Sequence, residues 1–290
     1  MLLYHIKEEK KDEILPEYLE MILTREEFGR LAWFHTDASI RGNLPEKDFK
    51  EILIPVPQID IQQELVDVYN GLKALAEQNE ALIEPLNKAC EAFIVDCKAK
   101  YPEVELSNGQ DDYIEICDER NSENKYTLDN VRGISTDKKF IFTKANMDGV
   151  SLTSYKIVNN NNFAYVADTS RRGDKIALAL NVTNKPILTS SIYTTFRCKD
   201  RSKLMPEYLY LLLSRSEFDR YARFNSWGSA RETFDWSELC RVKIPLPPLE
   251  VQQSIVDLYK CLEEAKKIAS EAREKLKALC PALVQRAANS

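Results

Sequence analysis

Residues 16–19 read Pro-Glu-Tyr-Leu, and residues 206–209 read the same four letters. Working outward from these two stretches without a gap, the chain matches itself at an offset of 190 residues as far as Tyr69 and Tyr259. Of the 54 pairs that begin at Pro16, 21 are identical. A repeat of this strength predicts two copies of one structural unit.

The first copy is shorter than the second. Two full copies at this offset need about 380 residues, and the chain has 290. Met1 aligns with Ser191, inside a run that has the composition of a β-strand. We therefore expect the first copy to lack the opening part that the second copy contains.

The second copy shows the order of elements in full. Short runs of β-branched and aromatic residues alternate with Gly, Asn and Asp, which predicts strands. Helical spacing then predicts one helix over 206–222, matched by 16–32, before a polar loop and a proline-rich exit over 242–248. The predicted strands are 113–116, 140–142, 155–158, 163–166, 176–180 and 187–196.

A long amphipathic helix follows the exit in each copy. Its apolar positions alternate four and three residues apart, and this period of 3.5 residues is typical of a coiled coil. Since the second helix can only return toward the first copy, we expect an antiparallel pair about 58 Å long; two helices that each pack on their own domain are the alternative. The predicted seams are Ile61, Leu65, Val68, Leu72, Leu75, Asn79, Leu82, Leu86, Ala89 and Phe93, and Val251, Ile255, Leu258, Leu262, Ala265, Ala269, Ala272, Leu276, Leu279 and Leu283.

The net charge of −6 hides an asymmetry along the chain. Residues 150–231 hold 13 Lys and Arg against 6 Asp and Glu, whereas residues 60–98 hold 3 against 8. A basic segment inside an acidic protein indicates a local surface for phosphate groups.

The residues now carry a resemblance. An Ile-Pro-x-Pro exit stands at 54–57 and again at 244–247, and a Gln-Gln pair opens both long helices at 62–63 and 252–253. Together with the basic domain and the repetition, this order resembles the specificity (S) subunit of type I restriction-modification systems, here lacking most of the first target-recognition domain. The second copy matches the usual helix-entry signature well, and the first copy matches it more loosely.

The resemblance implies a fold and a function. The fold is α+β, with target-recognition domains joined by two long helices in an antiparallel coiled coil. We expect a remnant of the first recognition domain at 1–58, the first spacer helix at 59–100, the second recognition domain at 101–248 and the second spacer helix at 249–290. The implied function is sequence-specific recognition of one half of a bipartite double-stranded DNA site.

The resemblance also implies partners. The helices would dock methyltransferase (modification) subunits, and a restriction subunit would join the complex. S-adenosylmethionine, ATP and Mg²⁺ would be bound by those partners and not by this chain. The short first copy has two explanations: the sequence is a piece of a longer subunit, or it is a naturally short chain that pairs with another copy. In the second case the stretch from Leu2 to Ile6 would be an edge strand without partners, which favours self-association through the truncated first domain.

Three segments are candidates for DNA contact, because polar and cationic side chains beside Gly suit phosphates and base edges. The alternatives are that Phe224 and Trp227 cap the domain core and that the Arg171–Lys175 turn is an ordinary solvated surface. The candidate residues are Asn225, Ser226, Trp227, Gly228, Ser229 and Arg231 in the first segment, Arg171, Arg172 and Lys175 in the second, and Ser190, Ser191 and Tyr193 in the third.

Catalytic motifs are absent from the sequence. There is no P-loop, no Gly-rich turn for S-adenosylmethionine, no Asn/Asp-Pro-Pro-Tyr/Phe and no nuclease core. Seven cysteines without a CxxC and two distant histidines predict buried, reduced thiols and no metal site. The missing motifs lead us to expect a non-catalytic protein. The lack of an apolar run long enough for a bilayer leads us to expect a cytoplasmic one.

Other functions stay open from the sequence. One is the specificity chain of a type II system with a fused methyltransferase-nuclease partner. A second is a coiled-coil scaffold without a DNA role, and a third, which the missing motifs disfavour, is a self-sufficient enzyme.

Overall fold

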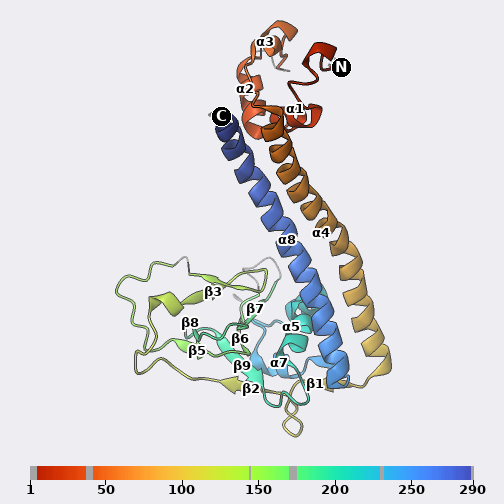
Figure 1. Ribbon diagram of the computed structural model, residues 1–290. Helices are drawn as coiled ribbons and strands as arrows, with labels where there is room; N and C mark the ends of the chain where they lie inside the picture. Colours follow the sequence, from red (N-terminus) through yellow and green to blue (C-terminus); the bar gives the residue numbers. More distant parts are fainter. Residues whose placement is uncertain (1–4, 37–41, 144, 170–174, 229–231, 289–290) are drawn as a thin grey trace. The chain divides into compact units, whose positions relative to one another are not determined.

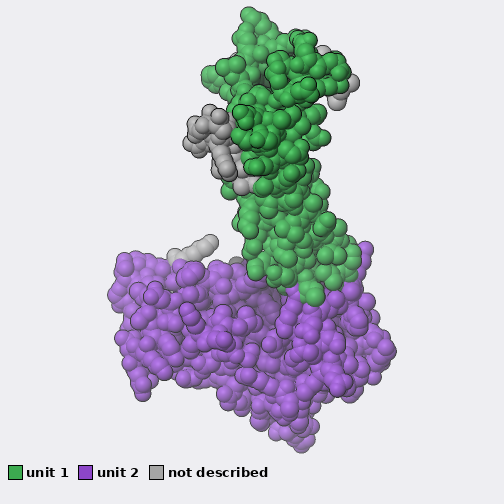
Figure 2. All heavy atoms as spheres, viewed as in Figure 1, with its two compact units in different colours: residues 1–87, 261–290 green, residues 88–260 purple. Residues whose placement is uncertain are grey.

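The chain divides into two compact units. The computed structural model describes residues 5–36, 42–143, 145–169, 175–228 and 232–288, with side chains as far as residue 278. Unit 1 comprises residues 1–87 and 261–290, and unit 2 comprises residues 88–260 (Figure 2). Two long helices, α4 (Ile59–Lys100) and α8 (Leu249–Ala288), contribute residues to both units.

Unit 1 is helical in the residues that are described. Its core joins Tyr18, Met21 and Ile22 of α1 to Leu65 and Val66 of α4. Pro16 opens α1, where its missing N–H has no helical acceptor to lose. The short helices before α4 are η1 (Glu8–Lys10), α1 (Pro16–Leu23), α2 (Glu26–Phe34) and α3 (Glu46–Glu51) (Figure 1).

Unit 2 contains the strands. Its largest sheet is antiparallel with the order β2-β9-β6-β7, and the smaller sheets pair β1 with β10, β3 with β4 and β5 with β8 (Figure 1). Strand β6 lies between β9 and β7 and is buried along its whole length. The strands are β1 (Glu103–Glu105), β2 (Ile114–Cys117), β3 (Arg132–Ile134), β4 (Phe140–Phe142), β5 (Lys156–Val158), β6 (Asn162–Val166), β7 (Ala177–Leu180), β8 (Ile187–Thr189), β9 (Thr194–Cys198) and β10 (Lys243–Pro245).

Helices cover the core of unit 2. The Phe163 and Phe196 rings stack with their centroids 4.6 Å apart, in the same apolar cluster as Tyr208 and Leu209. The helices are η2 (Leu128–Asn130), α5 (Pro206–Ser214), α6 (Ser216–Phe224) and α7 (Trp236–Cys240), besides the ends of α4 and α8.

A buried glutamine near the start of α8 joins distant parts of unit 2. The side-chain nitrogen of Gln252 donates to the carbonyl oxygens of Lys203 (2.8 Å) and Pro247 (2.9 Å). Its Oε1 accepts the backbone N–H of Met205 at 2.9 Å. The Tyr208 hydroxyl donates to the Pro245 carbonyl oxygen nearby, at 3.0 Å. We call this set of contacts the glutamine corner.

Unit 1 has the same corner 190 residues earlier. Gln62 donates to the carbonyl oxygens of Glu13 and Pro57 and accepts the N–H of Leu15, at 2.7 to 2.9 Å. The Tyr18 hydroxyl donates to the Pro55 carbonyl oxygen at 2.9 Å. The residues that match in the sequence therefore make matching hydrogen bonds.

Helices α4 and α8 pack side by side in unit 1 and run in opposite directions (Figure 1). The Arg273 guanidinium binds the Glu80 carboxylate through two hydrogen bonds of 2.8 and 2.7 Å. On α8, the predicted seam is buried at Leu262, Ala265, Ala269, Ala272 and Leu276. The predicted antiparallel coiled coil is confirmed.

The seam predicted for α4 was wrong at alternate positions. Val68, Leu75 and Leu82 of unit 1 are exposed, as is Phe93 of unit 2. In unit 1 the inward positions next to the exposed ones are Tyr69, Ala76 and Ile83, each one residue later along the helix. Both neighbouring rows are apolar, so the period alone could not choose between them. The side that faces α8 is the row that contains the small, fully buried Ala76.

Two predicted elements are interrupted. The predicted helix 206–222 is two helices, because Arg215 has an extended backbone (ψ 153°), and Arg25 interrupts the matching helix in the same way (ψ 147°). The predicted strand 187–196 breaks at a turn that the Tyr193 N–H closes onto the Ser190 carbonyl oxygen. The sequence analysis also missed β1, β3, α3 and α7. Of the edge strand expected from Leu2 to Ile6, residues 1–4 lie outside the described part, and His5 and Ile6 are not in a strand.

The cysteines are free in the described residues. Cys90, Cys97 and Cys198 are buried, Cys117 and Cys240 are half-buried, and Cys261 is exposed, which contradicts the prediction of buried thiols at that position. Burial raises the pKa of the Cys198 thiol to about 12. In the described part of the chain, none of the helices is both long and apolar enough to cross a membrane.

The glutamine corner predicts a stability difference between two adjacent residues. Gln252→Ala removes three buried hydrogen bonds and leaves two carbonyl groups and one N–H without a partner. We expect a loss of about 1–3 kcal/mol in the free energy of unfolding. Denaturant unfolding followed by near-UV circular dichroism measures it.

Gln253→Ala is the matched control, because within the described residues this side chain bonds to Asp257, on the surface of the same helix. The control should change the unfolding midpoint little. If the two substitutions lowered the free energy of unfolding equally, the buried hydrogen bonds of Gln252 would not stabilise the fold more than the surface bond of Gln253.

Candidate nucleic-acid interface

Two of the three candidate segments lie at the same end of the large sheet. Strands β6 and β7 are joined at this end by residues 167–176, since Val166 pairs with Ala177. Strand β9 begins here as well, because Thr194 pairs with Tyr165. The turn that contains Ser190, Ser191 and Tyr193 therefore lies beside the loop that contains Lys175.

The first segment, which contains Asn225 to Gly228, is tied to the base of that loop. The N–H of Thr169 donates to the Glu232 carbonyl oxygen at 3.2 Å, and the Phe234 N–H donates to the Ala167 carbonyl oxygen at 2.8 Å. Trp227 and Thr233 exchange two backbone hydrogen bonds of 3.0 Å. The fold thus brings all three candidate segments together.

Ser226 holds this junction together. Its hydroxyl donates to the Ala222 carbonyl oxygen at 2.6 Å and accepts the Thr169 hydroxyl at 2.9 Å, and the residue is buried. The amide nitrogen of Asn225 donates to the Tyr221 carbonyl oxygen at the end of α6. In this structure Ser226 positions the loop, while the predicted DNA contact by Ser226 stays a prediction.

The aromatic residues of this segment face solvent. Phe224, the last residue of α6, is 81% exposed, and Trp227 is 65% exposed. The alternative that these rings cap the domain core is therefore wrong. Gly228 follows with a φ of +143°, a conformation that favours glycine. Exposed rings beside a tight loop can stack on bases or sugars.

The turn between β8 and β9 contributes less polar surface than the sequence suggested. Ser191 is exposed, but Tyr193 packs against the cluster that contains Ile134 and Phe140. A Cβ atom at Gly133 would lie 4.0 Å from the Tyr193 hydroxyl oxygen. Ile192 of the same turn is exposed, and the sequence analysis did not select it.

Several predicted contacts fall outside the described residues. These are Arg171, Arg172, Ser229 and Arg231, which lie in the stretches 170–174 and 229–231. Lys175 is described and is exposed.

An ion pair that the sequence analysis missed holds the loops in place. The Lys138 ammonium, at the β3–β4 turn, lies 2.7 Å from Oδ1 of Asp219 on α6, and both side chains are largely buried. The Lys138 ammonium also donates to the Leu213 carbonyl oxygen at 2.9 Å. The same Asp219 oxygen accepts the N–H of Ile176, the residue after Lys175. Asp219 therefore fixes the hairpin, the β6–β7 loop and α6 together.

A difference between the two copies of the repeat could have indicated the anchoring role of Asp219. Gly29 stands in the first copy where Asp219 stands in the second, and the elements described before α4 in the first copy are helices. Burial lowers the pKa of Lys138, although Asp219 opposes that shift.

Some of the cations counted in the basic segment are neutralised. Their carboxylate partners come from residues 112–118, outside the segment, so the charge count overstated the free positive surface. Lys156 and Arg120 both lower the pKa of the Asp118 carboxyl through hydrogen bonds. The pairs are Lys156 with Asp118 (3.0 Å), Arg197 with Glu115 (2.7 Å) and Lys199 with Asp112 (3.7 Å).

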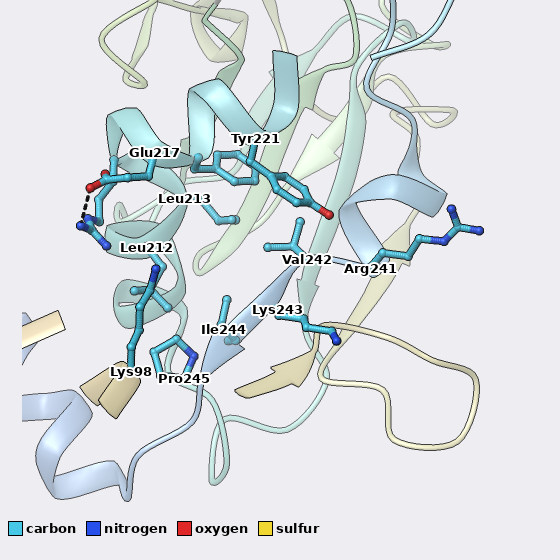
Figure 3. A pocket seen from close by; sticks show the side chains of 12 residues that line it. Lys98, Leu212, Leu213, Glu217, Tyr221, Arg241, Val242, Lys243, Ile244 and Pro245 are labelled. Carbon is cyan, nitrogen blue, oxygen red and sulfur yellow. Dashed lines mark hydrogen bonds and ion pairs between the residues drawn. The ribbon is translucent and has the colours of Figure 1, made fainter. Parts of the chain in front are cut away.

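A separate cavity of about 420 Å³ lies in unit 2. Its apolar lining includes Leu212, Phe218 and Ile244, and four cationic side chains line it as well (Figure 3). One of the four, Arg215, is paired with Glu217 at 2.8 Å. The candidate segments contribute no lining residue to it. The other three cations are Lys98, Arg241 and Lys243.

Metal binding finds no support in the described residues, where no group of three or more His, Cys, Asp or Glu side chains could hold an ion.

Comparison with known families identifies the domain. Residues 94–278 match the family model described as "Type I restriction modification DNA specificity domain". The chain belongs to this family. The resemblance seen in the sequence is confirmed, and DNA recognition in a type I restriction-modification system is the function of this specificity protein.

A solved structure shows a similar fold. The chain is similar to the type I restriction-modification system S subunit from M. genitalium, with a TM-score of 0.64 and 13% identity over 94% of this chain and 73% of that chain. It also matches the HsdS subunit from Thermoanaerobacter tengcongensis, with a TM-score of 0.36 and 16% identity over 96% and 70% of the two chains. A search of curated protein sequences finds no match. The match to the M. genitalium S subunit shows that the α+β fold with paired long helices occurs in a specificity subunit.

The Lys138–Asp219 pair predicts a pH-dependent loss of stability. Asp219→Asn leaves a buried ammonium without its counter-charge, and we expect a loss of about 3–5 kcal/mol at pH 7. The pKa of Lys138 in the folded variant should fall further below 10.5, its ordinary value. The folded variant then releases this proton more readily than the unfolded chain, so its stability rises as the pH rises toward 10.5.

Denaturant unfolding of the wild type and of Asp219→Asn at pH 7 and pH 10 checks this. The difference between their free energies of unfolding should be smaller at pH 10. Glu217→Gln is the control on the same helix, since Glu217 is an exposed partner of Arg215 and should cost at most about 1 kcal/mol. A gap that stays constant with pH would rule out Lys138 as its cause.

Proposed function

We propose that this chain reads one half of a bipartite DNA site through the loops at one end of the large sheet of unit 2. The observation that carries the proposal is the junction of three candidate segments at that end, inside the part of the chain that matches the specificity family. Lys175 supplies charge for phosphates, and Trp227 supplies a surface for stacking.

We further propose that this chain does no chemistry itself. Methylation and cleavage would belong to methyltransferase and restriction subunits, and S-adenosylmethionine, ATP and Mg²⁺ would be bound there. The lack of phosphate-binding and methyltransferase motifs in the sequence supports this assignment. The predicted self-association through the first unit and the cytoplasmic location belong to the same proposal.

The exposed apolar row of α4 supports docking of a methyltransferase subunit. Val68, Leu75 and Leu82 of unit 1 are spaced seven residues apart and all face solvent beside the α8 contact. Such a row favours a further helix, because a partner with matching spacing would bury it.

DNA binding tests the reading function. The chain, purified with its methyltransferase partner, should bind duplex DNA with an affinity that falls steeply with salt. Trp227→Ala should weaken binding by about 5- to 150-fold through loss of stacking. Lys175→Ala should reduce the slope of log affinity against log salt by about 1.

Val182→Ala is the matched control, because Val182 is an exposed side chain at the opposite end of strand β7. A wild-type complex without salt-dependent binding would favour the non-DNA scaffold. If Trp227→Ala and Val182→Ala changed the DNA affinity equally, the junction of the three loops would not be the DNA-binding surface.

Subunit docking can be tested separately. Leu75→Glu places a charge in the exposed row without disturbing the seam, so we expect the fold to persist and co-purification of the methyltransferase subunit to fall at least about tenfold. Gln78→Glu, an exposed position on the same helix outside this row, is the control. Undiminished co-purification of Leu75→Glu would place the docking surface elsewhere.

A further inference from the structure

Both units expose the same aromatic residue. Phe34 ends α2 in unit 1 and Phe224 ends α6 in unit 2, the two positions differ by 190, and each side chain is 81% exposed. An exposed arginine precedes each one by four residues, Arg30 in unit 1 and Arg220 in unit 2. Residues four apart lie on one face of a helix, so each unit presents an arginine and a phenylalanine together.

In unit 2 the equivalent exposure coexists with a sheet. The strands are present in unit 2, and they leave Phe224 uncovered while Phe218 and Ala222 of the same helix are buried. The helix therefore has one side for the core and another that stays in solvent when the domain is complete. Phe34 occupies the equivalent solvent side of α2.

A tryptophan extends the aromatic surface in each unit. Trp33 is 67% exposed in unit 1, and Trp227 is 65% exposed in unit 2, although the two do not match in the repeat. A Cβ atom at Gly42 would lie 2.7 Å from the Trp33 ring, so the chain passes this ring closely where only glycine fits. Two units that differ in sequence thus present one combination of side chains.

This combination suits duplex DNA. Arginine binds phosphate oxygens, and exposed aromatic rings stack on sugars and bases or insert between base steps. In unit 2 the combination adjoins the loops proposed to read DNA. In unit 1, Arg30 is 3.7 Å from Glu27 at an exposed position where solvent screens the pair, which leaves the guanidinium accessible.

We propose that the end of α2, with Arg30, Trp33 and Phe34, is a second DNA contact, equivalent to the end of α6 in unit 2. The inference rests on the proposed function and extends it, because unit 1 would then bind duplex DNA as well as unit 2. The contact would position the DNA and add affinity without reading a half-site in the manner of unit 2.

The test compares Phe34→Ala and Phe224→Ala in the complete chain with its methyltransferase partner. Each substitution should weaken duplex DNA binding by about 5- to 150-fold. Hydroxyl-radical footprints should lose protection at different positions for the two variants. Leu53→Ala is the control, because Leu53 is the most exposed apolar side chain described in unit 1 and stands where the second copy has Lys243.

The outcomes separate this inference from the function on which it rests. If the wild-type complex does not bind DNA, the proposed function fails and the inference fails with it. If Phe224→Ala weakens binding while Phe34→Ala equals the Leu53→Ala control, the function stands and the second contact is wrong. If Phe34→Ala changes only the oligomeric state in light scattering, the surface is a protein interface, which also overturns the inference.

Discussion

The amide of one buried glutamine fixes the point in each unit where a long helix begins. Gln252 and Gln62 each satisfy two carbonyl groups and one N–H from segments about 50 residues apart in the chain. Few other side chains carry both a donor and an acceptor at this reach, and a loss of either would strand buried polar groups. In each unit these hydrogen bonds connect the proline-rich exit, the two short helices before it and the start of the long helix.

The proposed interface in unit 2 depends on this corner through a short series of contacts. The N–H of Met205 is bound by Gln252, and α5 begins at the next residue. Helix α6 follows α5 and carries Asp219, which binds Lys138 of the β3–β4 turn and the N–H of Ile176. The described ends of the proposed binding loops are therefore anchored to the scaffold, and anchored ends reduce the entropy cost of ordering a loop on binding.

The repeat and the composition predicted much of the fold, for identifiable reasons. Strands β4 to β7 appeared because β-branched and aromatic residues cluster between turn residues. The seam of α8 appeared because, from Leu262 to Leu276, the residue that follows each seam position is polar or charged. The seam of α4 was ambiguous, since Leu75 and Ala76 are both apolar and only packing decides between them. The break at Arg215 is a single extended residue that local propensity does not mark.

The candidate site was predictable only in part. Loop composition selected Trp227 and Lys175, but no pattern in one sequence indicates that Thr169 meets Ser226 across 57 residues. Lys138 was not selected from the sequence, because its burial comes from tertiary packing against α6 and the end of α5. The pairing of Arg197 with Glu115 likewise depends on the register between β2 and β9.

Because the two corners make matching hydrogen bonds, segments of one copy of the repeat can replace the equivalent segments of the other. Suppose that recombination joined the first copy to the second at a point between the tyrosine and the glutamine of the corner. In the recombinant chain the tyrosine hydroxyl would still donate to a proline carbonyl oxygen, and the glutamine amide would still bond to three backbone groups. Each of these hydrogen bonds would be formed by residues of the same kind at the same spacing. A reading domain could therefore be replaced between the corners while the helices that follow fold as before, so that the DNA sequence recognised and the machinery of assembly could change independently.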